Sequence, residues 1–593
     1  MCGIAGYVLP KKAIEPSIIQ SMTKVLEHRG PDGEGIYISD NEHVALGHRR
    51  LSFLDLSASG QQPMKDRSGK YVLSFNGEIY NYVELKKELE SEGMSFQTHS
   101  DSEVVLNAYI KWGSQMLNLL KGMFAFAIYD QQKEELFLAR DRFGIKPLFY
   151  SVGNEYFAFA SEIKSFFECP NIQKKIRRES VARFLANRYV PSPHTIWEHI
   201  LQLPPAHFLI ININTLDYRA EQYWQLEFNQ QQNDQLEAEE KIHQLLKTSV
   251  TEHLRSDVPI GSFLSGGMDS SLMVLLMKET GYDPIDTFTI GFQDWEQSEH
   301  LYARKVADHL NVRLTEQYEQ NFSLDSVKHL MYHYDNPIAD ISILPTFSVS
   351  KLARQKVKAV LSGEGADECF GGYWWQQPEK FFFKNRWEKW KSKWKGILFS
   401  QIKEHYIQAN SMGLFDSDEL QKAFTPEWQQ AIPDDPFQHM DRFQLKNIST
   451  LKQIQYLDLN LFMSELVLVK IDRATMANSL EARVPFLDHH LVEYIFSLHE
   501  SVYFEKEKQK KILRGFLKGK VPSIIYERKK QGFVGPDKFY ENIPVYEEKL
   551  RNGKLIKDGV IRTSYVHELV QNKDHWRLWK LFVLENWWEV WMS

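Results

Sequence analysis

The repeating pattern of this sequence changes near residue 239, and that change constrains the fold more than any other feature. Before it, short apolar segments of the kind that form strands are separated by turns. After it, longer helical patterns alternate with short apolar strands. The first pattern predicts a layered α+β domain dominated by sheet, and the second predicts a parallel sheet with flanking helices. A chain of 593 residues is also too long for a single core.

Individual segments place the expected elements. In the N-terminal part we expect helices at 82–93 and 101–112 and strands at 71–75, 124–129 and 136–139, the first followed by the turn-type pair Asn76-Gly77. In the C-terminal part we expect a helix at 271–278 and strands at 260–264, 286–290 and 357–361.

These patterns divide the chain into a first domain at 1–215, a linker at 216–238 and a second domain at 239–593. The linker is polar and rich in Gln, although such a segment is also compatible with a surface loop inside one domain. Within the second domain, 373–455 is an aromatic and charged helical insertion. Trp387, Trp390 and Trp394 share a helical face there among lysines, which fits a buried aromatic face better than a membrane-surface helix. The segment 576–591 is predicted to be an amphipathic packing helix.

Composition excludes several classes of function. The formal net charge of −7 gives no support for a nucleic-acid partner. No run of 18 apolar residues and no signal peptide is present, so we expect no membrane span and a cytoplasmic location. The three cysteines Cys2, Cys169 and Cys369 cannot all pair within the chain, which fits a reducing compartment. Their spacing does not indicate a zinc site.

Cys2 is a candidate nucleophile. If the initiator Met is removed, the Cys2 thiol lies beside a free α-amine whose reference pKa is about 7.7–8.0, so that amine can act as a base near neutral pH. A thiol next to such a base is a plausible nucleophile. The alternative is that Met1 stays and that Cys at this position has no catalytic meaning.

A glycine loop follows the expected strand at 260–264. It reads Ser265-Gly266-Gly267-Met268-Asp269-Ser270-Ser271 and precedes a helix. A strand, a glycine turn and a helix N-terminus together favour phosphate binding, because backbone N–H groups and the helix dipole face the anion. The loop lacks the G-K-[ST] of a Walker A motif. An Asp inside it is explained if it holds Mg²⁺, which phosphates also bind.

A second polar loop, Ser362-Gly363-Glu364-Gly365-Ala366-Asp367-Glu368, follows the expected strand at 357–361. Three carboxylates at the end of a parallel strand indicate metal binding, acid/base chemistry or both, although a solvated acidic loop is the alternative. Near the C-terminus, 510–514 and 528–533 are cationic segments. Each alone is more often a solvated face than a phosphate clamp.

Taken in order, these motifs resemble the glutamine-hydrolysing asparagine synthetase family of the B type over nearly the whole chain. The first domain resembles the class II glutamine amidotransferase domain of that family, an Ntn-type glutaminase. The second resembles its PP-loop adenylating domain, with a helical C-terminal part. The strings that carry the resemblance are Met1-Cys2-Gly3-Ile4, 28–33, 47–52, 75–81, 100–103 and 139–144, followed by the two glycine loops, Asp472-Arg473 and 480–488.

The resemblance implies roles in the first domain. Cys2 would attack the side-chain amide of glutamine to form a glutamyl thioester, with its own α-amine as the base. Asn76 and the N–H of Gly77 match the oxyanion hole. Arg50 matches the residue that binds the glutamine α-carboxylate, although adjacent Arg49 leaves this position open by one. Glu78 and Asp101 match the groups that hold the glutamine α-ammonium.

The resemblance also implies roles in the second domain. Glu364 matches a residue proposed to help ammonia attack an acyl-adenylate, and Lys530 matches the lysine that neutralises charge as that adenylate forms. Asp269 and Asp367 match Mg²⁺ ligands. The positions that match the ATP site are Leu264, Ser265, Gly266, Gly267, Asp269, Ser270, Ile290, Ser362 and Gly363.

The implied reaction converts ATP, aspartate and glutamine to asparagine, glutamate, AMP and pyrophosphate. It requires ATP and Mg²⁺ and a dry tunnel for ammonia between the domains. The segment 335–340 lies where the family forms part of its acceptor pocket. It resembles the broader bacterial branch, whose members can amidate other carboxylates such as sugar acids, peptides or natural-product precursors, as much as it resembles strict asparagine synthetases. Such another carboxylate acceptor, and a catalytically silent scaffold, remain alternatives. Homodimers are common among relatives, so the resemblance also suggests a dimer.

Overall fold

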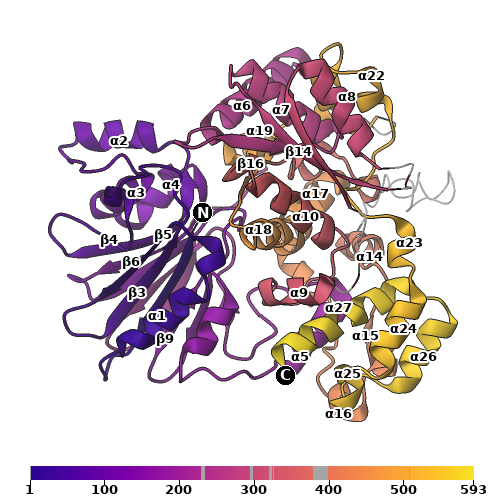
Figure 1. The fold of residues 1–593 in the computed structure, drawn as a ribbon, viewed down its shortest axis with the longest axis horizontal. Helices are drawn as coiled ribbons and strands as arrows, with labels where there is room; N and C mark the ends of the chain where they lie inside the picture. The colour runs from indigo at the N-terminus through magenta and orange to yellow at the C-terminus, as the bar shows by residue number, and fades with distance from the viewer. Residues whose placement is uncertain are drawn as a thin grey trace.

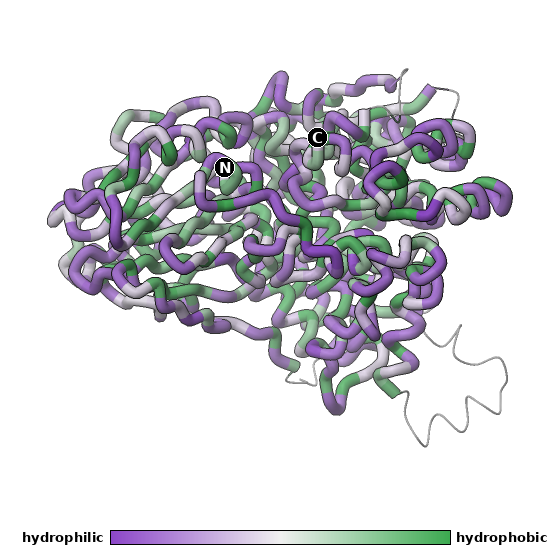
Figure 2. The backbone as a smooth tube through the Cα atoms, turned by 90° about the horizontal axis from the view of Figure 1, so that it is seen from below, coloured by the Kyte–Doolittle hydropathy of each residue, from purple (hydrophilic) through white to green (hydrophobic). Residues whose placement is uncertain are grey.

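The computed structural model describes residues 2–228, 234–293, 295, 298–319, 324, 326–377, 398–505 and 508–593. In Figure 1 a half rich in strands, coloured indigo to purple, stands beside a larger half rich in helices. Hydrophobic segments run through the interior of both halves, and hydrophilic segments lie mostly at the periphery (Figure 2). Within the described residues, no helix is long and apolar enough to cross a membrane.

The N-terminal half contains two six-stranded antiparallel sheets. The strand order is β10-β8-β9-β1-β3-β2 in the first and β12-β11-β7-β6-β5-β4 in the second. The strands are β1 Gly3–Val8, β2 Gly33–Ile38, β3 Val44–Arg50, β4 Met64–Lys65, β5 Tyr71–Ile79, β6 Gly122–Asp130, β7 Glu135–Arg140, β8 Phe149–Val152, β9 Phe157–Ala160, β10 Leu201–Gln202, β11 His207–Asn212 and β12 Tyr218–Gln222.

The two sheets pack face to face, with helices on the outer faces. Alternate side chains of both sheets, such as Ile4 and Leu138, form the shared core. Helix α1 (Pro16–Lys24) covers the first sheet, and α2 (Tyr82–Ser91) and α3 (Asp101–Trp112) cover the second. The predicted α+β sandwich is therefore confirmed.

Two local predictions in this half are wrong. Asn76-Gly77 does not end a strand, because β5 continues through both residues to Ile79 and pairs with β6 over this length. Tyr218–Gln222, inside the predicted linker, forms the edge strand β12 and pairs with β11. The polar composition that suggested a linker is the composition of an exposed edge strand.

The C-terminal half is built on a five-stranded parallel sheet, as predicted. Its strand order is β15-β14-β13-β16-β17. The chain adds β14 and β15 on one side of β13 and then adds β16 and β17 on the other side, so the order of the strands reverses between β13 and β16. The loops that leave the carboxyl ends of these two strands meet at this switch point, where α/β proteins bind ligands. The strands are β13 Ile260–Phe263, β14 Asp286–Phe292, β15 Arg313–Glu319, β16 Ala359–Leu361 and β17 Glu481–Arg483.

Helices cover this sheet and continue beyond it. A long helical path runs through α17 (Thr450–Leu457), a π-helical segment (Asp458–Val467) and α18 (Leu468–Met476). The other main helices are α5 Arg178–Asn187, α6 Gln235–His253, α7 Met268–Glu279, α8 His300–Leu310, α9 Ser326–His333, α10 Ile343–Arg354, α11 Ala366–Phe370, α14 Phe399–Asn410, α15 Ser417–Ala423, α19 His489–Ser497, α21 Lys511–Leu517, α22 Ser523–Glu527, α24 Ile543–Arg551, α26 Thr563–Gln571 and α27 His575–Trp591.

Two predictions concern the tryptophan-rich segments. Trp387, Trp390 and Trp394 lie outside the described residues. The final helix is not amphipathic, because every residue from 578 to 588 is buried, including Lys580 and Glu585. Lys580 donates to the carbonyls of Leu185 and Gly413, and burial lowers the pKa of its amine, so this polar side chain is accommodated inside the protein.

Candidate active sites

Cys2 lies directly before β1, beside β5 of the other sheet. Its backbone N–H donates to Asn76 Oδ1 of β5 at 2.9 Å, and its carbonyl accepts from Arg29 Nε at 3.1 Å. Its side chain is buried, and burial raises the pKa of the thiol, while the charge of Arg50 acts in the opposite direction. The backbone around the predicted nucleophile is thus held by two hydrogen bonds.

Asn76 and Gly77 present donors beside Cys2. Asn76 Nδ2 is buried and has no hydrogen-bond partner among the described residues. An orphaned buried donor is costly, so its position next to a predicted nucleophile fits a site that receives a developing negative charge. At Gly77, a Cβ atom would lie 2.3 Å from the carbonyl oxygen of Met123, so the strand tolerates only glycine here.

Glu78 and Asp101 are two acidic residues that lie close to each other in the first half. Both are buried, and Asp101 Oδ2 accepts from the Ile79 N–H at 3.0 Å. Burial raises the pKa of Asp101 to about 6 and also raises the pKa of Glu78. Glu78 faces Arg483 Nη2 at 3.3 Å, a contact from the C-terminal half that sequence patterns did not reveal. Two acids in one buried space suit an ammonium ligand.

The neighbours Arg49 and Arg50 point to opposite faces of β3. Arg49 Nη2 pairs with Glu34 at 3.2 Å, and its Nε donates to the Thr23 carbonyl. Arg50 bonds the carbonyls of the loop at 54–57 and lies near enough to the Cys2 thiol to lower its pKa. Of the two candidates, the geometry therefore favours Arg50.

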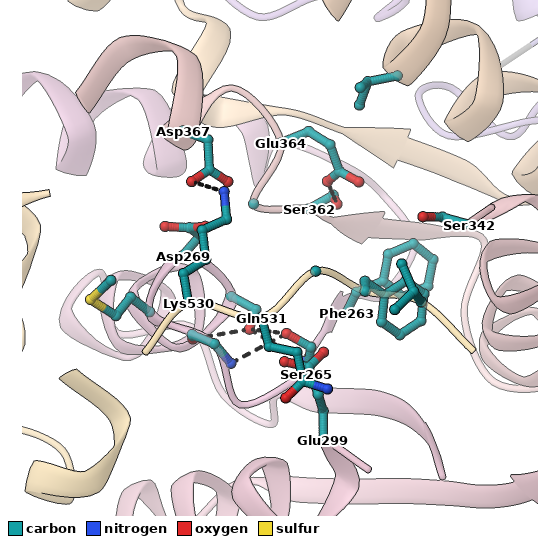
Figure 3. Close-up of a pocket in the computed structure, with 18 of the residues that line it drawn as sticks. Phe263, Ser265, Asp269, Glu299, Ser342, Ser362, Glu364, Asp367, Lys530 and Gln531 are labelled. Carbon is teal, nitrogen blue, oxygen red and sulfur yellow. Dashed lines mark hydrogen bonds and ion pairs between the residues drawn. The ribbon is translucent and has the colours of Figure 1, made fainter. Parts of the chain in front are cut away.

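A second candidate site is a cavity of about 290 Å³ at the switch point of the parallel sheet. Figure 3 shows the Ser265 loop and the Ser362 loop facing one another across it, with Lys530 and Gln531 on the segment that closes one side. Residues from both loops line it, as do Lys470 and Ile471 of α18. Most of the predicted ATP-site residues, including Leu264, are brought together here.

The glycine loop after β13 has the geometry of an anion cradle. Gly266 has a φ of +73°, and a Cβ atom there would lie 2.4 Å from the backbone nitrogen of Ala303. Ser265 Oγ accepts from the Gly267 N–H, and the Ser265 N–H donates to Ser270 Oγ. Helix α7 begins at Met268, so its N-terminus faces the cavity.

Two predicted ATP contacts, Gly266 and Ile290, do not line this cavity and stay predictions. Ile290 is buried in the hydrophobic core and is not part of the cavity wall. Its strand neighbours Phe288 and Thr289 line the cavity instead. The sequence of β14 did not show which of its residues line the cavity, because both faces of this strand are buried.

Two carboxylates and two lysines form the charged end of the cavity. Lys510 Nζ contacts Asp269 Oδ2 at 2.5 Å and Asp367 Oδ1 at 2.6 Å, and Lys530 forms an ion pair with Asp367. Burial opposes the charge of Lys510, but the two carboxylates raise its pKa. Lys530 Nζ also lies 3.8 Å from the centre of the Tyr373 ring. In the sequence, Lys510 is marked only by its place in the cationic segment 510–514.

This charged end fits a divalent cation. Asp269 and Asp367 supply the oxygen donors that Mg²⁺ prefers, and the ammonium of Lys510 between them shows that this position attracts positive charge. The described residues contain no group of three or more His, Cys, Asp or Glu side chains that could hold a metal alone. Any Mg²⁺ here therefore also requires ligand oxygens such as those of phosphates.

Glu364 and Glu368 lie on the second loop. Glu364 accepts a hydrogen bond from Ser362 Oγ and lines the cavity (Figure 3). Glu368 is buried and accepts from Tyr373 OH at 2.8 Å, and burial raises its pKa to about 8. The loop thus carries two different carboxyl groups. Glu364 can accept a hydrogen bond in the cavity, and Glu368 is held largely neutral near pH 7.

A buried charge network connects the two sites. Arg29, whose Nε donates to the Cys2 carbonyl, pairs with Glu162 at 2.8 Å and with Asp472 of α18 at 2.9 Å. Arg473 also pairs with Glu162 at 2.8 Å. Since Lys470 and Ile471 of the same helix line the second cavity, one short helix contacts both sites.

Comparisons with known proteins agree with this geometry. Residues 1–224 match the glutamine amidotransferase domain family, and residues 241–592 match the asparagine synthase family. The chain is 31% identical to glutamine-hydrolysing asparagine synthetase 1 of Bacillus subtilis over 99% of its own length and 96% of that protein. It is also 31% identical to asparagine synthetase 3 of the same organism, over 95% and 91%. Amidase chry2 of Gibberella zeae is 28% identical, over 92% and 91%.

An αββα half with an N-terminal cysteine site and a parallel-sheet half with an anion-binding loop together define a two-site glutamine amidotransferase. The chain belongs to the family of glutamine-hydrolysing asparagine synthetases. It is accordingly an enzyme of the carbon–nitrogen ligase class.

Proposed function

We propose that the enzyme hydrolyses glutamine at Cys2 and uses the released ammonia to convert aspartate to asparagine in the second cavity. The observation that supports this most is the joint presence of two complete constellations. One is Cys2 with the orphaned amide of Asn76, and the other is the Ser265 loop with Asp367 and Lys530. A scaffold without activity would not need to keep both.

In the first site, Cys2 Sγ bonds to the side-chain carbon of glutamine, ammonia leaves, and water then releases glutamate from the thioester. Asn76 Nδ2 and the Gly77 N–H stabilise the oxyanion, a contribution of about 2.7–4 kcal/mol for each donor. Arg50 binds the α-carboxylate in a fork geometry, and Glu78 and Asp101 bind the α-ammonium.

In the second site, the substrate carboxylate attacks the α-phosphorus of ATP and pyrophosphate leaves. Ammonia then attacks the acyl carbon, AMP leaves, and Glu364 is placed to accept a proton. The Ser265 loop holds the phosphates through its backbone, and Lys530 offsets charge as the adenylate forms. Mg²⁺, when bound at Asp269 and Asp367, supplies charge neutralisation on the phosphates.

For the acceptor carboxylate, the proposal has an alternative to aspartate. A fungal relative of similar coverage is called an amidase and not an asparagine synthetase. Asp340 and Ser342 line the acceptor end of the cavity, where the Ser342 N–H donates to Asp340 Oδ1 at 2.7 Å. A polar wall of this kind is compatible with aspartate and with another small carboxylate, such as a sugar acid or a peptide.

The test is pyrophosphate release from ATP and Mg²⁺, measured with aspartate and with or without glutamine, with the product identified by mass. Asparagine as the product supports the proposal. Glutaminase activity without aspartate-dependent pyrophosphate release would assign the same chemistry to another carboxylate. Neither activity in a folded protein would favour the scaffold alternative. The homodimer also stays a prediction, which light scattering can test.

A further inference from the structure

A second large cavity lies apart from both candidate active sites. Its volume is about 280 Å³, close to that of the nucleotide cavity. Its walls come from both halves of the chain. They include 142–143, Ser192 and 204–207 of the N-terminal half, the connecting segment at 222–226, 442–443, Tyr456 and the π-helical segment Asp458–Val467. None of the residues assigned to glutamine, ATP or the acceptor lines it, so it has no role in the proposed reaction.

Glu465 forms the buried polar end of this cavity. Its side chain is 5% exposed, and one carboxylate oxygen accepts from Ser192 Oγ. Within the described residues, Glu465 has no direct ion-pair partner. Burial raises the pKa of this carboxyl, while Ser192 and the charges of Arg442 and Arg140 act in the opposite direction. A buried acid without a direct ion pair is costly, and a ligand that brings a positive charge would reduce that cost.

Arg442 lies at the open end, one hydroxyl away from Glu465. Its Nη1 donates to the Ser192 carbonyl at 3.1 Å and its Nη2 to Ser192 Oγ at 3.4 Å. The guanidinium lies over the Phe443 ring, 4.6 Å from its centre, and is exposed. An Arg has five N–H groups, and in the part of the chain that the structure describes only two of those of Arg442 have an acceptor, so the others can bind an anion. Ser192 thus links the carboxyl group of Glu465 to the guanidinium of Arg442 by hydrogen bonds along one side of the cavity.

One part of the wall is apolar and aromatic, while the remainder is lined by polar or charged side chains, namely Arg142, His207, Gln222, Gln225, Asn460 and Ser464. Phe143 and Trp224 pack edge to face with ring centres 5.3 Å apart, and Tyr456, Leu226 and Leu459 complete the apolar part. We propose that this cavity binds an α-amino acid with an apolar side chain. Its ammonium would pair with Glu465, its carboxylate with Arg442, and its side chain with the aromatic wall.

Such a ligand would also act on catalysis. The π-helical segment lines both cavities, because Leu459, Asn460 and Glu465 face the second one, while Phe462, Met463 and Val467 face the nucleotide site. π-Helical turns occur frequently at functional sites. Occupancy of the second cavity is therefore expected to change the apparent KM for ATP, which makes this an effector site.

The first experiment is isothermal titration calorimetry of the full-length enzyme with three probes of similar shape. L-Leucine carries both charges, 4-methylpentanoic acid lacks the ammonium, and isoamylamine lacks the carboxylate. We expect L-leucine to bind at least about tenfold more tightly than either other probe. No binding of L-leucine, or equal binding of 4-methylpentanoic acid, would overturn the proposal.

Variants locate the site. Glu465→Gln and Arg442→Gln should each weaken L-leucine binding by about tenfold or more, and Arg442 is exposed, so its variant should fold normally. Lys446→Gln, an exposed charge loss four residues from Arg442, should leave binding unchanged. Asp101→Asn serves as a second control, because its loss of leucine binding would place the ligand in the glutamine site and contradict the proposal. Binding that persists in both cavity variants would contradict it equally.

Discussion

Arg29 holds the backbone carbonyl of Cys2 with its Nε while its two terminal nitrogens bond both carboxylate oxygens of Asp472, at 2.9 and 3.1 Å. The two partners are 443 positions apart in the chain, and both are buried. A fork-to-carboxylate pair of this kind fixes geometry as well as charge. The position of the predicted nucleophile in one half therefore depends on a helix of the other half.

Asp472→Asn tests this dependence. Because it leaves Arg29 buried without its full counter-charge, the free energy of unfolding should fall by about 3–5 kcal/mol. Glutaminase kcat/KM should fall by about ten- to a hundredfold through misplacement of Cys2. Denaturant melts and a glutamate-release assay measure the two effects. Glu34→Gln is the matched control, because it removes an ion pair of Arg49 with a partly exposed partner. Equal effects of both variants would refute the coupling.

Lys510 should be essential to the second site only. Lys510→Met removes the ammonium between Asp269 and Asp367, so the two carboxylates repel each other and the bound phosphates. We expect pyrophosphate release to fall by about a hundredfold or more while glutamine hydrolysis is retained. Lys511→Met, at the next position and with no recorded partner among the described residues, should change neither activity. Unchanged pyrophosphate release in Lys510→Met would exclude Lys510 from the site.

Local motifs allowed much of this site to be predicted from the sequence, and long-range contacts explain the rest. Short sequence motifs contain Cys2, Asn76 and the Ser265 loop, so pattern and resemblance identified these residues as candidates. Lys510 reaches Asp269 across 241 positions, and nothing near it in sequence marks it as different from a surface lysine.

The same distinction explains the errors in the fold. Periodicity predicted the sheet-rich N-terminal domain from its short apolar strands separated by turns, and the parallel sheet of the C-terminal domain from strands alternating with helical segments. It failed for α27, which was predicted to be amphipathic. This helix is apolar on most of its surface, and even its charged residues Lys580 and Glu585 are buried. Arg483, which contacts Glu78 from the other half, has a role that only the tertiary structure reveals.

Arg50 and Arg49 should differ sharply in their effect on glutamine binding. Arg50→Lys loses the fork that suits a carboxylate, so the KM for glutamine should rise by about tenfold or more. Arg49→Lys affects a residue tied to Glu34 on the opposite face and should change KM by about twofold at most. Steady-state glutaminase kinetics of the two variants measure this. The reverse order would transfer the carboxylate-binding role to Arg49.

Asn76 and Cys2 should separate transition-state stabilisation from nucleophilic attack. Asn76→Ala removes one oxyanion donor and should lower kcat for glutamine by about 10²–10³. Cys2→Ala should abolish glutamine-dependent synthesis but leave synthesis from added ammonia intact, because the second cavity lies elsewhere. The readout is product formation with glutamine and with ammonium chloride. Glutamine-dependent turnover that survives in Cys2→Ala would show that the N-terminal assignment is wrong.

Asp101 should make glutamine binding and stability depend on pH in opposite directions. Its pKa is about 6 in the folded protein and near 3.9 when unfolded, so the folded state binds more protons between these values. Its favourable contribution to stability is complete below pH about 4 and is lost as the pH rises through about 6.

Binding of the glutamine ammonium needs the ionised form, so the KM for glutamine should rise as the pH falls below 6. Asp101→Asn should therefore be more stable than the wild type at pH 8, bind glutamine poorly at every pH, and show a weaker pH dependence of KM, because Glu78, whose pKa burial also raises, is retained. Chemical denaturation at pH 5 and pH 8, with KM measured over the same range, tests both; a variant less stable at pH 8 would contradict the sign of the shift.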